Sequence, residues 1–195
     1  MTDLDIAVIL GSTRPNRNGK AVADWVVAQA ADRPGARYTL LDLLDYPLPH
    51  LDEAIPPSVG RYAGEHTKAW ADTIASYDGF VFVTPEYNHS TSGVLKNAID
   101  YLYAEWNNKA AGFVSYGTVG GARAVEHLRG VMSEVQVAHV RQSVGFSLYH
   151  DFENLSQFSP NARAADQLAI MLDQLEAWTA ALKGVRENRL AQAAA

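Results

Sequence analysis

The sequence contains no cysteine among its 195 residues. This absence excludes disulfides, thiolate-bound metal sites and a cysteine nucleophile. The histidines include no HExxH-like pair, so no metal site is expected; they lie far apart, at His50, His66, His89, His127, His139 and His150. No convincing catalytic triad is present either.

Positive charge is scarce as well, with 16 Lys and Arg against 22 Asp and Glu and a formal net charge of −6. Nucleic-acid binding draws much of its affinity from neutralised phosphates, so this balance argues against it but leaves room for one local anion site. The start, MTDLD, is acidic where a signal peptide would be basic, and the apolar run behind it is too short to span a membrane. We expect a cytoplasmic protein with neither a membrane nor a nucleic-acid partner.

The chain lacks internal repeats, and its only low-complexity tract is the closing LAQAAA. Nearly half of the residues, 48%, are hydrophobic, which is enough for one sizeable core. We therefore expect a single domain over residues 1–195, with its core at about 5–183 and a frayed tail at about 184–195.

Short apolar runs alternate with helical patterns along the chain. Strands are expected where the runs are rich in β-branched and aromatic residues, at 5–10, 37–43, 79–84, 110–116 and, more weakly, 139–146. Helices are expected between them, at 19–31, 66–77, 92–106, 120–135 and 161–183. Strands that are apolar on both faces and alternate with helices predict a doubly wound α/β fold, a parallel sheet with helices on both faces.

One segment, 45–64, holds four of the eight prolines. Proline removes backbone donors and breaks regular structure, so this segment is expected to be irregular. An irregular stretch of this length is either a functional loop or an interface, or else a simple connector.

Chemically rich segments follow three of the expected strands. The first strand runs into the loop GSTRPNRNGK (11–20), the third into PEYNHSTSG (85–93) and the fourth into GTVGGA (117–122). Ligands of open parallel α/β sheets bind beyond the carboxyl ends of the strands. We therefore expect the three loops to meet at one edge of the sheet.

The first of these loops predicts an anion site. It leads into a helix, so free backbone N–H groups and the positive end of the helix dipole would face a bound group. Its hydroxyl and cationic side chains would add donors and charge: Ser12, Thr13, Arg14, Arg17 and Lys20. The spacing of the glycines excludes a Walker loop, and the Rossmann GxGxxG is missing. The alternative, that the cations are simply solvated, applies most to Lys20.

The second loop presents a carboxylate, a phenol and an amide in succession, in Glu86, Tyr87 and Asn88. Pro85 ends the preceding strand and removes a donor. Such a patch could read a flat heterocycle, with Tyr87 against its face or edge. A plain turn and helix cap, with the cap residue at 90–92, is the alternative.

The third loop is dense in glycine, with Gly117, Gly120 and Gly121. The absence of side chains lets a backbone approach a ligand closely. Glycines also serve tight strand-to-helix turns, so this loop indicates a ligand site only together with the other two loops.

Three segments together, GSTRPNRNGKAVADWV, TPEYNHSTSGVLKNAIDYL and SYGTVGGARAVEHLR, resemble the three signatures of the NADPH-dependent FMN reductase family in order and spacing. The resemblance covers about residues 5–146. It implies a flavodoxin-like sheet of order 2-1-3-4-5, FMN as cofactor, and NADPH or NADH as electron donor. It also implies a homodimer and leaves open whether dimers pair into tetramers.

The resemblance assigns roles to individual positions. The FMN phosphate would lie against Ser12, Arg14, Arg17, Asn18 and Gly19. The isoalloxazine ring would be bordered by Pro85, Glu86, Tyr87 and Asn88, and on its other side by Ser115, Gly117, Gly120 and Gly121.

Two positions depart from the family pattern. Ser92 stands where a proline is common, which is expected to loosen the start of the following helix. Arg17 stands where other branches carry a small hydroxyl residue, so the phosphate is expected to be held more by charge than by hydroxyls.

The activity implied by the resemblance is a two-step exchange. A nicotinamide cofactor passes hydride to FMN, and a small acceptor such as a quinone, free flavin, azo compound or metal oxyanion then takes the electrons. The flavin carries the chemistry, so no catalytic side chain is required, although His89 lies where it could donate a proton to a reduced quinone.

Two other functions stay open at this stage. One is a flavin-binding electron carrier or regulatory module without its own nicotinamide turnover. The other is a nucleotide-processing α/β enzyme that uses Glu86 as its nucleophile and binds no flavin.

Overall fold

Five parallel strands form the centre of the computed structural model, which describes residues 4–193. Their order, β2-β1-β3-β4-β5, is the order 2-1-3-4-5 implied by the family resemblance. The strands are β1 (Leu4–Leu10), β2 (Ala36–Asp42), β3 (Gly79–Pro85), β4 (Lys109–Gly117) and β5 (Val137–Ser147). The prediction of a flavodoxin-like, doubly wound α/β fold is therefore confirmed.

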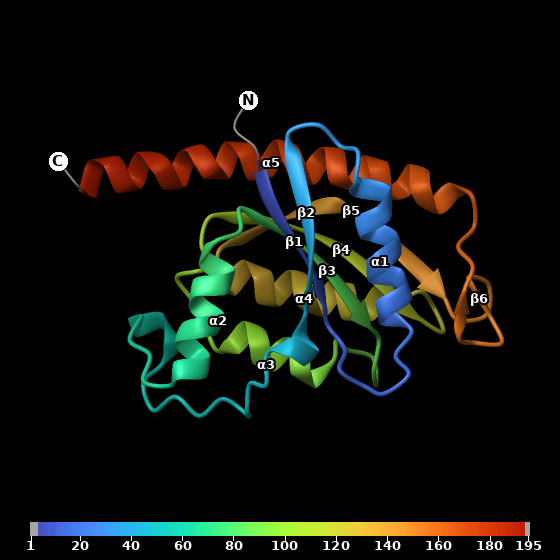
Figure 1. Cartoon of the computed structure of the whole chain (residues 1–195), viewed down its shortest axis with the longest axis horizontal. Coiled ribbons are helices and arrows are strands. Elements are labelled where there is room, and N and C mark those ends of the chain that lie inside the picture. The colour runs from blue at the N-terminus through green and yellow to red at the C-terminus, as the bar shows by residue number, and fades with distance from the viewer. Residues whose placement is uncertain (1–3, 194–195) are drawn as a thin grey trace.

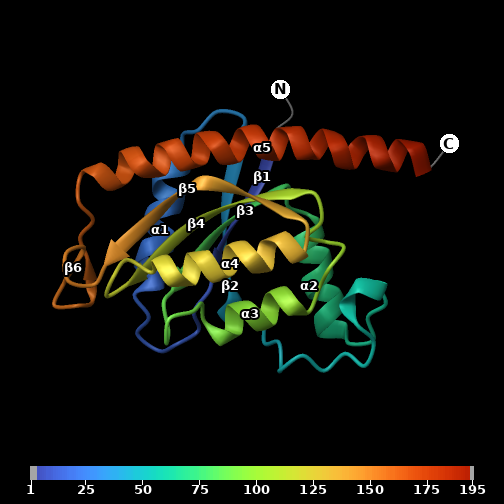
Figure 2. The same ribbon diagram turned by 180° about the vertical axis from the view of Figure 1, so that it is seen from behind.

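Helices cover both faces of this sheet, as Figures 1 and 2 show from opposite sides. One face carries α1 (Gly19–Ala30) and α5 (Arg163–Ala193), and the other carries α2 (Glu65–Ala75), α3 (Gly93–Asp100) and α4 (Ala122–Glu134). Alternate residues of a strand point to opposite faces, so Val8 joins the core beneath α1 and α5 while Ile9 joins the core beneath the other helices. Because β3 and β4 are buried on both faces, most of each strand is one apolar run, at 79–83 and 110–114.

The helix predicted over 92–106 ends earlier, with α3 stopping at Asp100. Trp106 is fully buried, and its indole N–H donates to the Ile99 carbonyl at 3.1 Å. That bond requires the chain to turn back under the end of the helix. Burial of one large aromatic side chain thus overrides the helical periodicity of the sequence.

Helix α5 continues to Ala193, beyond the predicted end at 183. Asp78, just before β3, pairs with Lys183 at 2.8 Å and with Arg186 at 2.6 Å, and these contacts anchor the additional turns to the sheet. Despite its length, neither α5 nor any other helix within residues 4–193 is apolar enough to cross a membrane.

The proline-rich segment 45–64 is irregular, as predicted, apart from the end of the 3-10 turn η1 (Leu43–Asp45) and a second 3-10 turn within it, η2 (Pro57–Val59). The Asn97 amide fastens it to α3, donating to the Pro49 carbonyl at 2.7 Å and accepting from the Leu51 N–H at 3.0 Å. The segment is therefore held against the helix that follows the second loop.

A short hairpin follows β5, formed by the antiparallel strands β6 (Phe152–Glu153) and β7 (Gln157–Phe158). The hairpin is not predictable from the sequence, because strands of two residues have no measurable periodicity. Figure 1 shows the hairpin at the end of the molecule where the chain enters α1.

Candidate functional site

The three loops meet at the carboxyl ends of β1, β3 and β4, where the sequence placed them (Figure 1). We refer to residues 11–18 as the first loop, 86–92 as the second loop and 118–121 as the third loop. The Tyr87 hydroxyl lies 3.1 Å from the Ser12 hydroxyl, which joins the second loop to the first. This contact joins two loops that are far apart in sequence into one surface.

The first loop leaves the N-terminus of α1 open. Asn18 occupies the N-cap position, where an Asn side chain ordinarily accepts a hydrogen bond from the first turn, but it makes no such bond. Its amide instead donates to the Leu155 carbonyl at 2.8 Å. The first-turn N–H groups are therefore left for a bound anion, which the helix dipole also favours.

Beneath this opening lies the hydroxyl of Tyr116. The residue is only 5% exposed, and within residues 4–193 its hydroxyl has no hydrogen-bond partner. A Cβ placed on Gly19 would lie 2.5 Å from the Tyr116 oxygen, so glycine is required there. Burial raises the pKa of Tyr116, so the phenol keeps its proton and remains a donor. A buried donor without a partner is costly, which marks this spot as a place for a ligand.

The cations of the first loop have different partners. Arg17 pairs with Asp42 at the end of β2, with a side chain that is only 10% exposed. The Asp42 carboxylate therefore compensates the positive charge of Arg17, which the sequence predicted to face the phosphate. Lys20 pairs with Asp24 one turn along α1, at 2.6 Å. Arg14 is exposed, and no described carboxylate pairs with it, so its charge is available to a bound anion.

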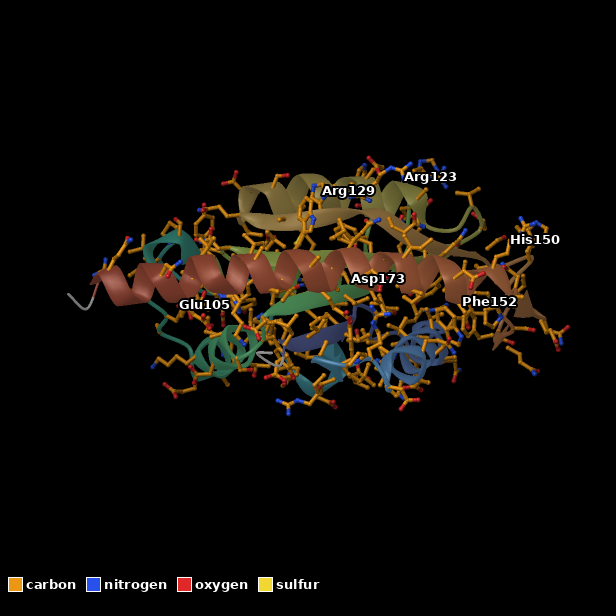
Figure 3. The ribbon with its side chains drawn as sticks, turned by 90° about the horizontal axis from the view of Figure 1, so that it is seen from above. Glu105, Arg123, Arg129, His150, Phe152 and Asp173 are labelled. Atoms are coloured by element: carbon orange, nitrogen blue, oxygen red, sulfur yellow. The ribbon has the colours of Figure 1, made fainter. Side chains whose placement is uncertain are left out.

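Glu86 connects the second loop to α4. Its side chain is 6% exposed and pairs with Arg123, whose Nε donates to the carboxylate at 2.6 Å and whose backbone N–H donates at 3.2 Å. Figure 3 shows Arg123 at the start of α4. A carboxylate with these donors is held in place and weakened as a nucleophile, which speaks against the Glu86 nucleophile hypothesis.

A two-residue turn forms the tip of the second loop. Tyr87 and Ser90 exchange backbone hydrogen bonds at 2.9 and 3.0 Å, while Asn88 and His89 have φ angles of 49° and 67°. Two positive φ angles in succession are typical of a type I′ turn. The turn leaves the side chains of Asn88 and His89 exposed at the edge of the site.

Ser92 caps α3 instead of loosening its start, so the expectation from the missing proline is wrong. Its hydroxyl accepts from the Leu95 N–H at 3.2 Å and donates to the Gly11 carbonyl. The hydroxyl thus satisfies a free donor of the helix and fixes the first loop to the second.

The third loop wraps tightly over the end of β4. Gly120 and Gly121 have φ angles of 77° and 78°, which favour glycine. The Ser115 hydroxyl donates to the Gly120 carbonyl at 2.7 Å. Gly121 is the N-cap of α4 and offers no side-chain cap, but the Glu86 carboxylate accepts from the Arg123 N–H in the first turn at 3.2 Å and takes that place.

Comparison with known proteins decides the family. The family model described as NADPH-dependent FMN reductase matches residues 4–151. The chain belongs to the NADPH-dependent FMN reductase family. The recognition made from the three loop motifs is confirmed.

Individual relatives extend this result. An NAD(P)H-dependent FMN reductase of Schizosaccharomyces pombe is 45% identical over 128 residues, covering 65% of this chain and 64% of that protein, slightly under two thirds. A 2-hydroxy-1,4-benzoquinone reductase of Burkholderia sp. is 31% identical over 198 residues, covering 96% and 99% of the two chains. In fold, the chain is similar to the flavoenzyme NAD(P)H:(acceptor) oxidoreductase of Paracoccus denitrificans, at 21% identity and a TM-score of 0.68 over 93% and 98% of the chains.

The residues present fit the FMN that the family implies. The partnerless hydroxyl of Tyr116 and the uncapped turn of α1 lie together at one place for a dianionic phosphate, and the positive charge of Arg14 acts on the same hydroxyl. The exposed Tyr87 and the glycines of the third loop border the space beside it, which suits a flat ring. Within residues 4–193 no cluster of three metal-ligating side chains competes with this assignment.

Several site residues were missed by sequence reasoning: Asp42, Arg123 and Tyr116. Tyr116 had a usable signal, since it is a polar aromatic residue at the end of an otherwise apolar strand. Asp42 and Arg123 had none, because their partners, Arg17 and Glu86, are known only from the fold.

A cleft of about 440 Å³ adjoins the first loop on the β2 side. The first loop, the proline-rich segment and α3 line it, among other residues with Thr13, Tyr46, Leu48, Val94 and Asn97. The mostly apolar lining suits a flat or apolar partner better than a charged one.

Proposed function

We propose that the protein is an FMN-dependent NAD(P)H oxidoreductase that passes electrons to a small acceptor, such as a quinone or free flavin. One observation carries the proposal: the uncapped N-terminus of α1 lies over the buried, partnerless hydroxyl of Tyr116. This pair of features is suited to a phosphate monoester, and the adjacent loops are suited to a flat ring. The activities named for the relatives from S. pombe and Burkholderia support the proposal.

In this proposal the protein binds and orients, and FMN, when bound, supplies the hydride chemistry. Arg14 and the first turn of α1 hold the phosphate, and Tyr116 donates from below. Glu86 and Arg123 keep the second and third loops at a fixed separation. The exposed His89 at the tip of the second loop is a candidate to deliver a proton to a reduced acceptor.

Anaerobic mixing with a nicotinamide donor tests the function. The purified protein loaded with FMN should lose its visible flavin absorbance when NADPH or NADH is added without air, and a quinone should restore it. Retained absorbance with both donors would favour the electron carrier or regulatory module. A protein that is neither yellow nor stabilised by added FMN would contradict the proposal altogether.

A homodimer in the cytoplasm is part of the proposal. Exposed apolar side chains flank the cleft, with Leu44 at 58% and Val94 at 40% exposure, and subunit contacts commonly cover such patches. Light scattering should therefore give about twice the 21.2 kDa of one chain, or a multiple of that dimer. The mass of a single chain would contradict this part of the proposal and leave the activity untouched.

A further inference from the structure

The β6–β7 hairpin contacts the first loop although it lies outside the region matched by the family model, which ends at residue 151. We propose that this hairpin holds the first loop in its phosphate-binding shape and thereby sets how tightly the phosphate end of the flavin is retained. The inference rests on the proposed function. It makes Asn18 a positioning residue and not a phosphate ligand.

The base of the hairpin is rigid. Asp151 is only 4% exposed, and its carboxylate accepts from the Ser147 N–H at 2.8 Å and from the Asn161 amide at 3.0 Å. Its carbonyl accepts from the Ser159 N–H at 2.9 Å. One buried residue therefore ties the strand before the hairpin to the chain after it.

Aromatic packing places the hairpin under the phosphate site. Phe158 makes edge contacts with Phe146 and with Trp25 of α1, at centroid distances of 4.8 and 6.0 Å. Phe152 lies 5.1 Å from Phe158 and 6.4 Å from Tyr116, whose hydroxyl lies below Gly19. Figure 3 shows Phe152 at the same end of the molecule as Arg123. The hairpin is thus packed against two side chains that support the first loop from below.

The tip of the hairpin has an unusual backbone. Asn154 and Leu155 have φ angles of 50° and 59°, and the Ser156 N–H donates to the Glu153 carbonyl at 3.1 Å. A left-handed conformation costs a residue such as leucine about 1–2 kcal/mol. Strain of this kind persists where the surrounding structure requires it, often at functional sites.

The strained turn contacts Asn18 of the first loop. The turn directs the Leu155 carbonyl to the Asn18 amide, 2.8 Å away. An Asn at an N-cap otherwise satisfies the helix's own N–H groups. This bond anchors the start of α1 to the hairpin, so that the uncapped first turn is held in register with the buried hydroxyl of Tyr116.

The test compares the affinities of the full-length protein for FMN and for riboflavin, which lacks the phosphate. In Leu155→Pro the proline ring forbids a φ of 59°, so the carbonyl leaves Asn18. Loss of one well-made hydrogen bond should weaken FMN by up to about tenfold and leave riboflavin unchanged. Leu155→Gly is the matched control, because glycine accepts the same φ and keeps the carbonyl; its FMN affinity should equal that of the wild type.

Two further variants keep the test decisive if Leu155→Pro does not fold. Leu155→Val disfavours the φ of 59° through its branched side chain and takes the place of Leu155→Pro in the comparisons, including the double variant. Asn18→Ala leaves the contacts at the base of the hairpin intact and should show the same loss, selective for FMN. The double variant should be no worse than Asn18→Ala alone, because both changes remove one shared contact. Additive losses would mean that Asn18 binds the phosphate directly and would overturn the inference.

Other outcomes separate the inference from the function. Arg14→Ala is the reference for a phosphate-selective loss, since it removes charge without touching the hairpin. Two results with a wild type that binds FMN would show that the hairpin does not act on the phosphate. In one, Leu155→Pro has the wild-type affinity for FMN; in the other, its affinities for FMN and riboflavin fall equally. If the wild type binds neither flavin, the proposed function fails and this inference fails with it.

Discussion

Gly121→Ala is expected to lower the free energy of unfolding by roughly 2–5 kcal/mol and to abolish FMN binding. Gly130→Ala, in the helix that Gly121 precedes, should raise the free energy of unfolding by about 0.5–1 kcal/mol. Gly121 has a φ of 78°, which alanine adopts only with strain. A Cβ there would also lie 2.6 Å from the Cβ of Ser115 and 3.0 Å from the backbone nitrogen of Tyr116. Neither neighbour can withdraw, because both belong to the buried strand β4.

Gly130 makes this comparison a strict one. It lies in the middle of α4, and a Cβ added to it meets no atom within 4 Å apart from the backbone of its own helix and its chain neighbours. Alanine there only reduces the freedom of the unfolded chain. Urea unfolding of both variants measures the two free energies, and flavin titration measures binding. Equal stabilities for the two variants would show that the third loop relaxes at little cost, contrary to the packing described.

The architecture was predictable because its signals are local. Strands buried on both faces give unbroken apolar runs, and β3 and β4 appear in the sequence close to where the structure has them. The errors fall where distant contacts decide the local structure. Burial of Trp106 ends α3 early, and the pairs of Asp78 with Lys183 and Arg186 extend α5.

The position of the site was predictable from the sequence, but its internal contacts were not. Parallel strands fix the edge at which their loops meet, so the grouping of the three loops followed from the fold class. The pairing of side chains inside that edge did not follow. Arg17 pairs with Asp42, and nothing near Arg17 in the sequence identifies that partner. Ser92 caps α3 through the Leu95 N–H, as the alternative of a cap at 90–92 allowed, and only its second bond, to the Gly11 carbonyl, depends on the fold.

Backbone groups and charged side chains have different roles in the site. The groups that face the flavin space are mostly backbone N–H groups and glycines, while Arg17 and Glu86 are paired with Asp42 and Arg123, and Arg14 alone of these charges has no described carboxylate partner. Paired charges give a fixed frame and contribute little net field. We therefore expect the geometry of the loops, more than any single charge, to determine flavin binding, and the Glu86–Arg123 pair is the strongest link in that frame.

Arg123→Ala is accordingly expected to lower the free energy of unfolding by about 2 kcal/mol and to weaken FMN binding. Removing one partner of a fully buried ion pair costs about 3–5 kcal/mol, because the other charge is left buried. The Arg123 side chain is 42% exposed, so water can reach the gap and reduces the cost. The backbone N–H of residue 123 also remains as a donor to Glu86.

Three further variants identify why Arg123→Ala loses stability. Lys20→Ala removes the exposed pair with Asp24 and should cost no more than about 0.5 kcal/mol, since such pairs are screened by water. Arg123→Lys keeps the charge but not the planar fork, and its stability should fall between those of the wild type and Arg123→Ala. Adding Glu86→Gln to Arg123→Ala should recover part of the lost stability, because no buried charge then lacks a partner. If the double variant is the least stable of all, the pair acts through packing and not through charge.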